Sequence, residues 1–179
     1  MIFPLFRRSK RRATISALYG MIVAQARMPA FYRDYGTSDT LNGRFELIVL
    51  HLALVLERFA QDPVLRNLGQ PLFDRFCRDM DDNLREIGIG DLAVPKHMRR
   101  VGEAFYGRAI AYKSALAAGG DRALAEALAR NIYGGADPVP AAARLAAYVR
   151  EAAAALASQN ATDLAAGRLR FPAPAVLAA

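Results

Sequence analysis

The stretch RFELIVLHLALVLERF, residues 44–59, decides the fold class. Apolar residues fill nearly every position from 47 to 56, so a helix over 41–61 would be apolar on all sides and should be surrounded by other helices. The uncharged run is only about half of the ~20 residues that a helix needs to cross a bilayer. We therefore predict a buried central helix, with His51 hydrogen-bonded in the interior.

Outward from this helix, apolar residues continue at three- and four-residue spacing. The spacing predicts further helices over 14–28, 71–87, 95–117, 121–133 and 141–158, with glycine or proline at most boundaries. Gly69-Gln70-Pro71 should interrupt the helical structure before the third long helix. Residues 28–40 should form a loop whose aromatic side chains either fold back or face a partner. No run of residues alternates between apolar and polar with period two, so no β-strand is predicted.

The predicted fold class is therefore all-α, a single-domain, irregular helical bundle of six or seven helices. We expect a basic and apolar N-terminal tail over 1–12, a helical core over 13–134, and a C-terminal helix with a flexible tail over 135–179. The only cysteine, Cys77, excludes an internal disulfide and fits a reducing, cytoplasmic compartment. Neither histidine has the spacing of a metal or haem site, so no metal is expected.

The net charge of +7 is concentrated at the N-terminus. Residues 1–12 hold five basic residues and no acid, while the remaining 19 Lys and Arg face 17 Asp and Glu. A nearly neutral body argues against specific DNA binding. An apolar start followed by basic residues is typical of attachment to an anionic membrane surface. The predicted membrane-binding residues are Ile2, Phe3, Leu5, Phe6, Arg7, Arg8, Lys10, Arg11 and Arg12. A disordered solubilising tail and a ribosomal RNA contact are the alternatives.

Charged residues on the third long helix lie three or four residues apart and admit two interpretations. They form ion pairs on a solvated face, or they contact a partner. At the start of the central helix, Asp39 or Thr40 can cap the helix, and Arg44 should pair with Asp39 or Asp74 in a buried or solvated contact. Lys96, His97, Arg99 and Arg100 form a second basic patch.

Three motifs together resemble the ubiquinol–cytochrome c chaperone family: Asp39–Phe45, Asp74–Met80 and Gly102–Arg108. The resemblance covers roughly residues 18–116 and fades in the Ala-rich C-terminal third. Members of that family assist assembly of respiratory complex III, and the mitochondrial members hold newly made cytochrome b, work with a small partner protein and lie near the ribosome.

The resemblance implies a non-enzymatic assembly chaperone without a cofactor, located in the cytoplasm at the face of the inner membrane, with cytochrome b as client. It implies that the client-binding residues are Asp39, Arg44, Phe45, Asp74, Arg75, Arg78, Asp79, Phe105, Tyr106 and Arg108. We expect the charged residues from Asp39 to Asp79 among them to converge near the aromatic loop. The alternatives are a helical-bundle enzyme with a carboxylate-lined pocket and a ribosome- or RNA-associated factor. No phosphate loop or nucleophile–base pair supports an enzyme.

Overall fold

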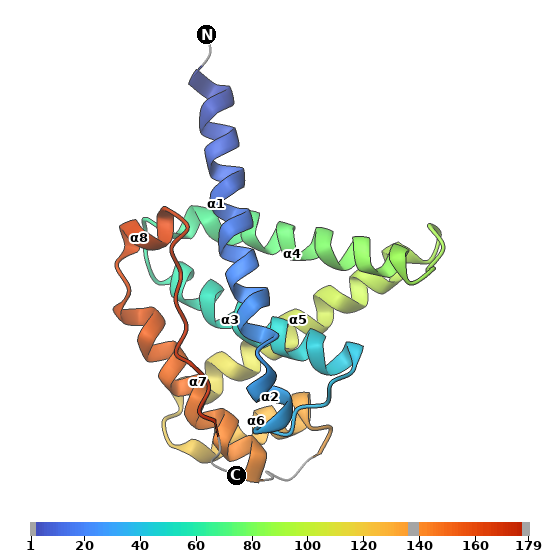
Figure 1. Ribbon diagram of the computed structural model, residues 1–179, viewed down its shortest axis with the longest axis vertical. Coiled ribbons are helices and arrows are strands. Elements are labelled where there is room, and N and C mark those ends of the chain that lie inside the picture. The colour runs from blue at the N-terminus through green and yellow to red at the C-terminus, as the bar shows by residue number, and fades with distance from the viewer. Residues whose placement is uncertain (1–2, 136–139, 177–179) are drawn as a thin grey trace.

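The computed structural model describes residues 3–135 and 140–176, with side chains from residue 9 onward except that of residue 121 (Figure 1). The described residues form eight helices and no strand, which confirms the all-α class. Six helices are long and two have five residues. They are α1 (Phe3–Ala26), α2 (Pro29–Arg33), α3 (Leu41–Ala60), α4 (Arg66–Glu86), α5 (Val94–Ala117), α6 (Asp121–Ile132), α7 (Pro140–Ser158) and α8 (Ala161–Ala165).

Helix α3 is the centre of the fold, as its composition predicted. It packs against α1, α4, α5, α6 and α7, and its residues from Glu46 to Val55 are all buried. The helix begins where the Thr40 hydroxyl accepts a hydrogen bond from the Gly43 amide, so Thr40 is the N-cap. Gly43 is required here because a side chain at this position would overlap the carbonyl oxygen of Ser38.

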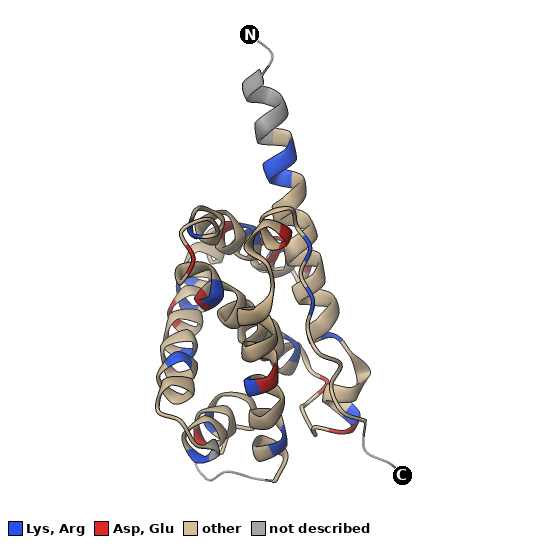
Figure 2. Ribbon diagram, turned by 90° about the vertical axis from the view of Figure 1, so that its left-hand side faces the viewer, with Lys and Arg blue, Asp and Glu red and all other residues tan. Residues whose placement is uncertain are grey.

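Helix α1 begins at Phe3 instead of Thr14, so the backbone of the expected N-terminal tail is helical from residue 3. The segment projects beyond the other helices (Figure 1), and Figure 2 shows the basic residues at its base. Its only proline, Pro4, stands in the first turn, where a missing amide hydrogen costs little. Arg and Lys, which follow it, have high intrinsic helix propensity and so favour a helix even where tertiary contacts are few. The prediction that the helix begins at Thr14 was therefore wrong.

Helix α4 also begins earlier than predicted and runs through Pro71. Proline has no amide hydrogen for the carbonyl four residues before it, so the carbonyl of Asn67 loses its helical partner. The guanidinium of Arg11 donates to this oxygen at 2.6 Å. A side chain from α1 thus satisfies the carbonyl that the proline leaves free, and the predicted break at Gly69-Gln70-Pro71 does not occur.

The C-terminal segment is packed on the body, in contrast to the flexible tail that the sequence suggested. Leu164 and Leu169 are buried, and the Phe171 ring lies 5.1 Å from that of His51. Gln25 donates to the carbonyl of Pro172 at 2.9 Å. Residues 161–176 therefore belong to the same core as the long helices.

Candidate functional site

The three family motifs meet in an aromatic cluster at the junction of α3, α4 and α5. Phe73 on α4 lies 4.9 Å from Phe105 and 5.5 Å from Tyr106, both on α5. Phe45 on α3 joins through Phe76, 6.3 Å away. Phe105 is buried, whereas Tyr106 is 56% exposed. Of the aromatic residues predicted to bind a client, Tyr106 is thus the most exposed, whereas Phe45 is partly buried.

Arg108, the last residue of the third motif, is bound internally by a residue that the sequence analysis did not single out. Its Nε and Nη2 each donate to one carboxylate oxygen of Glu46 at 2.5 Å. Glu46 is 1% exposed. Burial raises the pKa of its carboxyl, and the hydrogen bonds and charge of Arg108 oppose the shift. Because both oxygens are occupied, Glu46 is not placed as an acid or base for a ligand.

Asp39 and Arg44 pair as predicted, and the pair is solvated. Arg44 Nε donates to Asp39 Oδ1 at 2.7 Å, and both side chains are about half exposed. This hydrogen bond lowers the pKa of Asp39. The interpretation as a buried network is therefore wrong. The pair borders an open hollow of about 590 Å³ that also includes Tyr32 and Arg27.

The charges on α4 do not converge with Asp39 and Arg44 into one hollow. Asp74 accepts from Gln70 at 2.7 Å, and Asp79 accepts from the Tyr19 hydroxyl at 2.8 Å. Arg75 and Arg78 line a separate hollow against α1. The cause is helical register, since Arg75 and Arg78 lie on the stripe of α4 that faces α1. Ion pairing along the helix is present at Arg85, which bonds Asp81 at 2.7 Å.

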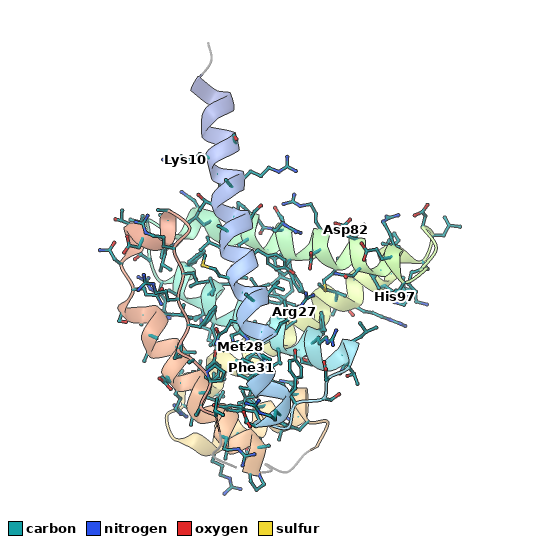
Figure 3. The ribbon with its side chains drawn as sticks, viewed as in Figure 1. Lys10, Arg27, Met28, Phe31, Asp82 and His97 are labelled. Atoms are coloured by element: carbon teal, nitrogen blue, oxygen red, sulfur yellow. The ribbon has the colours of Figure 1, made fainter. Side chains whose placement is uncertain are left out.

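The aromatic loop predicted over residues 28–40 contains the short helix α2, which the sequence analysis did not predict, and it folds back onto the body. Phe31 and Tyr35 are buried, and Figure 3 shows Phe31 within the body near the end of α1. Phe31 stacks edge-on against both His51 and Tyr148. The loop is therefore a structural element, with Tyr32 only partly exposed.

His51 is fully buried and fully hydrogen-bonded, as predicted. The carbonyl of Leu47 can only accept, so Nδ1–H donates to it at 2.7 Å. Nε2 then accepts from the Tyr148 hydroxyl at 2.9 Å, whose oxygen accepts from Gln25. Burial lowers the pKa of His51 to about 4, so the ring is neutral at physiological pH.

An apolar groove between α3 and α5 is the feature that sequence reasoning missed. Tyr106, Ile110 and Lys113 form a stripe on the outer side of α5, and the groove has a volume of about 230 Å³. A second hollow of about 340 Å³ continues it toward α7. The two share Leu54, Glu57, Lys113 and Leu116. Lys113 bonds Glu57 across this shared part at 3.1 Å. The four-residue spacing of Tyr106 and Ile110 could have revealed the groove.

The predicted membrane-binding residues fall only partly within the described side chains. Ile2 lies outside the described residues, as do the side chains of Phe3, Leu5, Phe6, Arg7 and Arg8. Lys10, Arg11 and Arg12 are exposed, and Lys10 stands on the projecting part of α1 (Figure 3). His97, from the second basic patch, lies near the far end of the hairpin formed by α4 and α5 (Figure 3).

Across the described residues, no group of three or more His, Cys, Asp or Glu side chains is arranged to hold a metal ion. Within the same residues, every helix is too short or too polar to pass through a bilayer.

Comparison with known proteins agrees with this arrangement. The sequence model of a family described as ubiquinol-cytochrome C chaperone matches residues 33–171, well beyond the expected limit at residue 116. The crystal structure of the Cbp3 homolog from Brucella abortus matches with a TM-score of 0.85 and 41% sequence identity, over 96% of this chain and 97% of that one. No curated protein matches the chain. Because the family match spans most of its length, the chain belongs to the ubiquinol-cytochrome c chaperone family.

Proposed function

We propose that this protein is a non-enzymatic chaperone for assembly of ubiquinol–cytochrome c reductase, and that it holds newly made cytochrome b at the cytoplasmic face of the inner membrane. Membership in the chaperone family supports the assembly role. Cytochrome b consists of transmembrane helices, so its binding partner must offer a surface that accepts an apolar helix before the helix finds its final neighbours.

The groove between α3 and α5 is the observation that carries the proposal. It is lined mainly by apolar side chains of both helices, and its rim holds Tyr106 and Ile110, which are 56% and 64% exposed. Large apolar residues that stay exposed next to a groove are typical of protein-binding surfaces. A second hollow continues past the ion pair of Lys113 and Glu57 toward α7, and the two hollows together lengthen the surface offered to a client helix.

Five of the other predicted client-binding residues contribute in three ways. Phe105 supports Tyr106 from beneath, since Phe105 is buried and its ring lies 5.6 Å from that of Tyr106, and Phe45 joins the same cluster through Phe76. Asp39 and Arg44 are exposed and form a polar contact surface at the start of α3. Arg108 supports the groove through Glu46, because it ties α5 to α3 directly below.

The test is co-purification of cytochrome b from detergent-solubilised membranes with the tagged full-length protein. The variant Tyr106→Glu/Ile110→Glu places two carboxylates at the rim of the groove. Loss of two central apolar contacts should cost at least about 2 kcal/mol, or roughly thirtyfold in affinity.

The matched control is Val64→Glu, because Val64 is 63% exposed and lies in the turn between α3 and α4, away from the groove. This variant should retain the client. If both variants retain cytochrome b equally and both are folded, the groove is not its binding site. If the wild-type protein captures no cytochrome b, the proposed client is wrong.

A further inference from the structure

An open hollow between α1 and α4 gathers four arginines around one acidic residue. Its volume is about 680 Å³. The arginines are Arg11, Arg12, Arg75 and Arg78, and the acid is Asp82. The apolar side chains of Ile15 and Pro71 complete the lining together with Ser16.

One stripe of each helix forms this hollow. On α4, residues 71, 75, 78 and 82 follow each other at three- and four-residue spacing, and on α1 the pair 11–12 is one turn from the pair 15–16. Contacts in the next turn of α1 hold the stripes face to face. The Tyr19 hydroxyl donates to Asp79 at 2.8 Å, and the Arg75 guanidinium lies 5.0 Å over the Tyr19 ring.

Pro71 helps to fix the position of Arg11, one of the four arginines. It leaves the carbonyl of Asn67 without a helical donor, and Arg11 fills that position at 2.6 Å. Arg11 is thereby held against α4. The hollow is thus a built feature of the interface between α1 and α4.

Two of the four arginines take no part in the polar contacts of the described residues. Among the described residues, neither Arg12 nor Arg78 has a hydrogen bond or ion pair. Arg75 reaches Asp79 only at 3.5 Å. Four guanidinium groups in a hollow lined by a single carboxylate repel each other, although Asp79 lies beside Arg75, and an anion in the hollow would relieve this repulsion. One guanidinium group can bind two phosphate oxygens at once through two parallel, directional hydrogen bonds.

We propose that this hollow binds the phosphate group of an anionic phospholipid at a membrane surface. The ligand chemistry is a phosphate ester. The projection of α1 beyond the other helices favours a lipid over a soluble source (Figure 1). The helix continues for six residues from Arg12 back to Phe6, a rise of about 9 Å, and the sequence there is Phe3-Pro4-Leu5-Phe6.

An apolar N-terminal sequence followed by a cluster of arginines matches the order of layers at a bilayer surface. Apolar side chains enter the acyl boundary, and basic groups stay at the phosphates. The site adds α4 residues to the attachment surface that the N-terminal sequence suggested, and it separates Arg75 and Arg78 from the client surface. It does not depend on which client the α3–α5 groove holds.

Vesicle binding by the purified full-length protein tests the site. The vesicles contain phosphatidylglycerol in phosphatidylcholine, with phosphatidylcholine alone as the neutral reference. The variant is Arg12→Gln/Arg78→Gln, which removes the two arginines that have no internal partner. The control is Arg100→Gln/Arg130→Gln, which removes the same charge from two exposed positions outside the hollow. Both variants should melt at the wild-type temperature.

The hollow variant should lose roughly thirtyfold in affinity for the anionic vesicles, and the control less than about threefold. Equal losses in the two variants would show a general charge effect and overturn the site. A second arm uses soluble glycerol 3-phosphate. If it raises the melting temperature of the wild-type protein while anionic vesicles bind no better than neutral ones, the lipid assignment is overturned. Retention of a ribosomal RNA fragment without vesicle binding would overturn it as well.

Discussion

Replacing Arg108 by alanine should lower the free energy of unfolding of the protein. Any loss of client binding should follow from this loss of stability. Glu46 is 1% exposed, and both of its carboxylate oxygens accept from Arg108 at 2.5 Å. Removing one partner of a buried pair leaves an uncompensated charge, which costs about 3–5 kcal/mol. In a domain of this size each kcal/mol lowers the melting temperature by about 2–4 °C, so the expected fall is about 6–20 °C.

The pH dependence of this loss identifies its cause. Burial raises the pKa of Glu46 even with Arg108 present, and without Arg108 the pKa should rise further. The folded variant then holds a proton that the unfolded chain releases above about pH 4.3. Its stability should therefore fall as the pH rises above that value, and the penalty should be smaller at about pH 5 than at about pH 8.

Thermal melts followed by circular dichroism measure the effect, and Arg130→Ala on α6 serves as an exposed control with a change below about 0.5 kcal/mol. The double variant Glu46→Leu/Arg108→Met should recover most of the loss, because an apolar pair of similar volume replaces both charges. If Arg108→Ala melts like the wild type at every pH yet no longer captures the client, Arg108 contacts the client and the structural explanation fails.

Three further changes test other parts of the fold. Gly43→Ala should destabilise the protein by about 1–3 kcal/mol, because the new methyl group would overlap the Ser38 carbonyl. Asn42→Ala, at the exposed neighbouring position, should leave the melting temperature unchanged. Equal melting temperatures of the two variants would contradict this packing. In the wild type, stability should fall from about pH 6.5 toward pH 4, by at most about 3 kcal/mol from His51, since the unfolded chain takes up a proton that the buried ring does not. His51→Gln should flatten the pH profile of stability over that range, and an unchanged slope would exclude His51 as its source. Tyr19→Phe should cost about 1–2 kcal/mol in urea titrations through loss of the bond to Asp79, and a neutral result would show that this bond does not hold α1 on α4.

Local periodicity was sufficient to predict that the long helices exist, although not where α1 and α4 begin. The apolar run of α3 is continuous in the sequence, so its burial could be inferred without knowing any partner. The pairing of Arg44 with Asp39 was also within reach, because the two residues are five positions apart.

Long-range contacts caused the failures. The helical course of α4 through Pro71 depends on Arg11, 56 residues before the carbonyl that it binds. The ordered C-terminal segment depends on Gln25 and His51, which lie more than 100 residues earlier. Composition predicted a flexible tail there, because Ala, Gly and Pro carry no signal of the partner that covers them.

The candidate site was likewise predicted only in part, because its residues could be named from sequence but their long-range contacts could not. The aromatic residues of the three motifs were named from sequence, but their meeting in one cluster follows from the packing of α3, α4 and α5. Glu46 was not singled out, because its partner Arg108 lies 62 residues away. The groove arises only when the outer stripe of α5 lies beside α3.

Photo-crosslinking from defined positions during synthesis of cytochrome b tests the central claim most directly. A photoreactive residue at position 110, on the rim of the groove, is compared with one at position 64, which is equally exposed but lies outside it. Our account predicts a crosslink to cytochrome b from position 110 and none from position 64. A crosslink from position 64 alone, or none from either position in a protein that still co-purifies with cytochrome b, would contradict it.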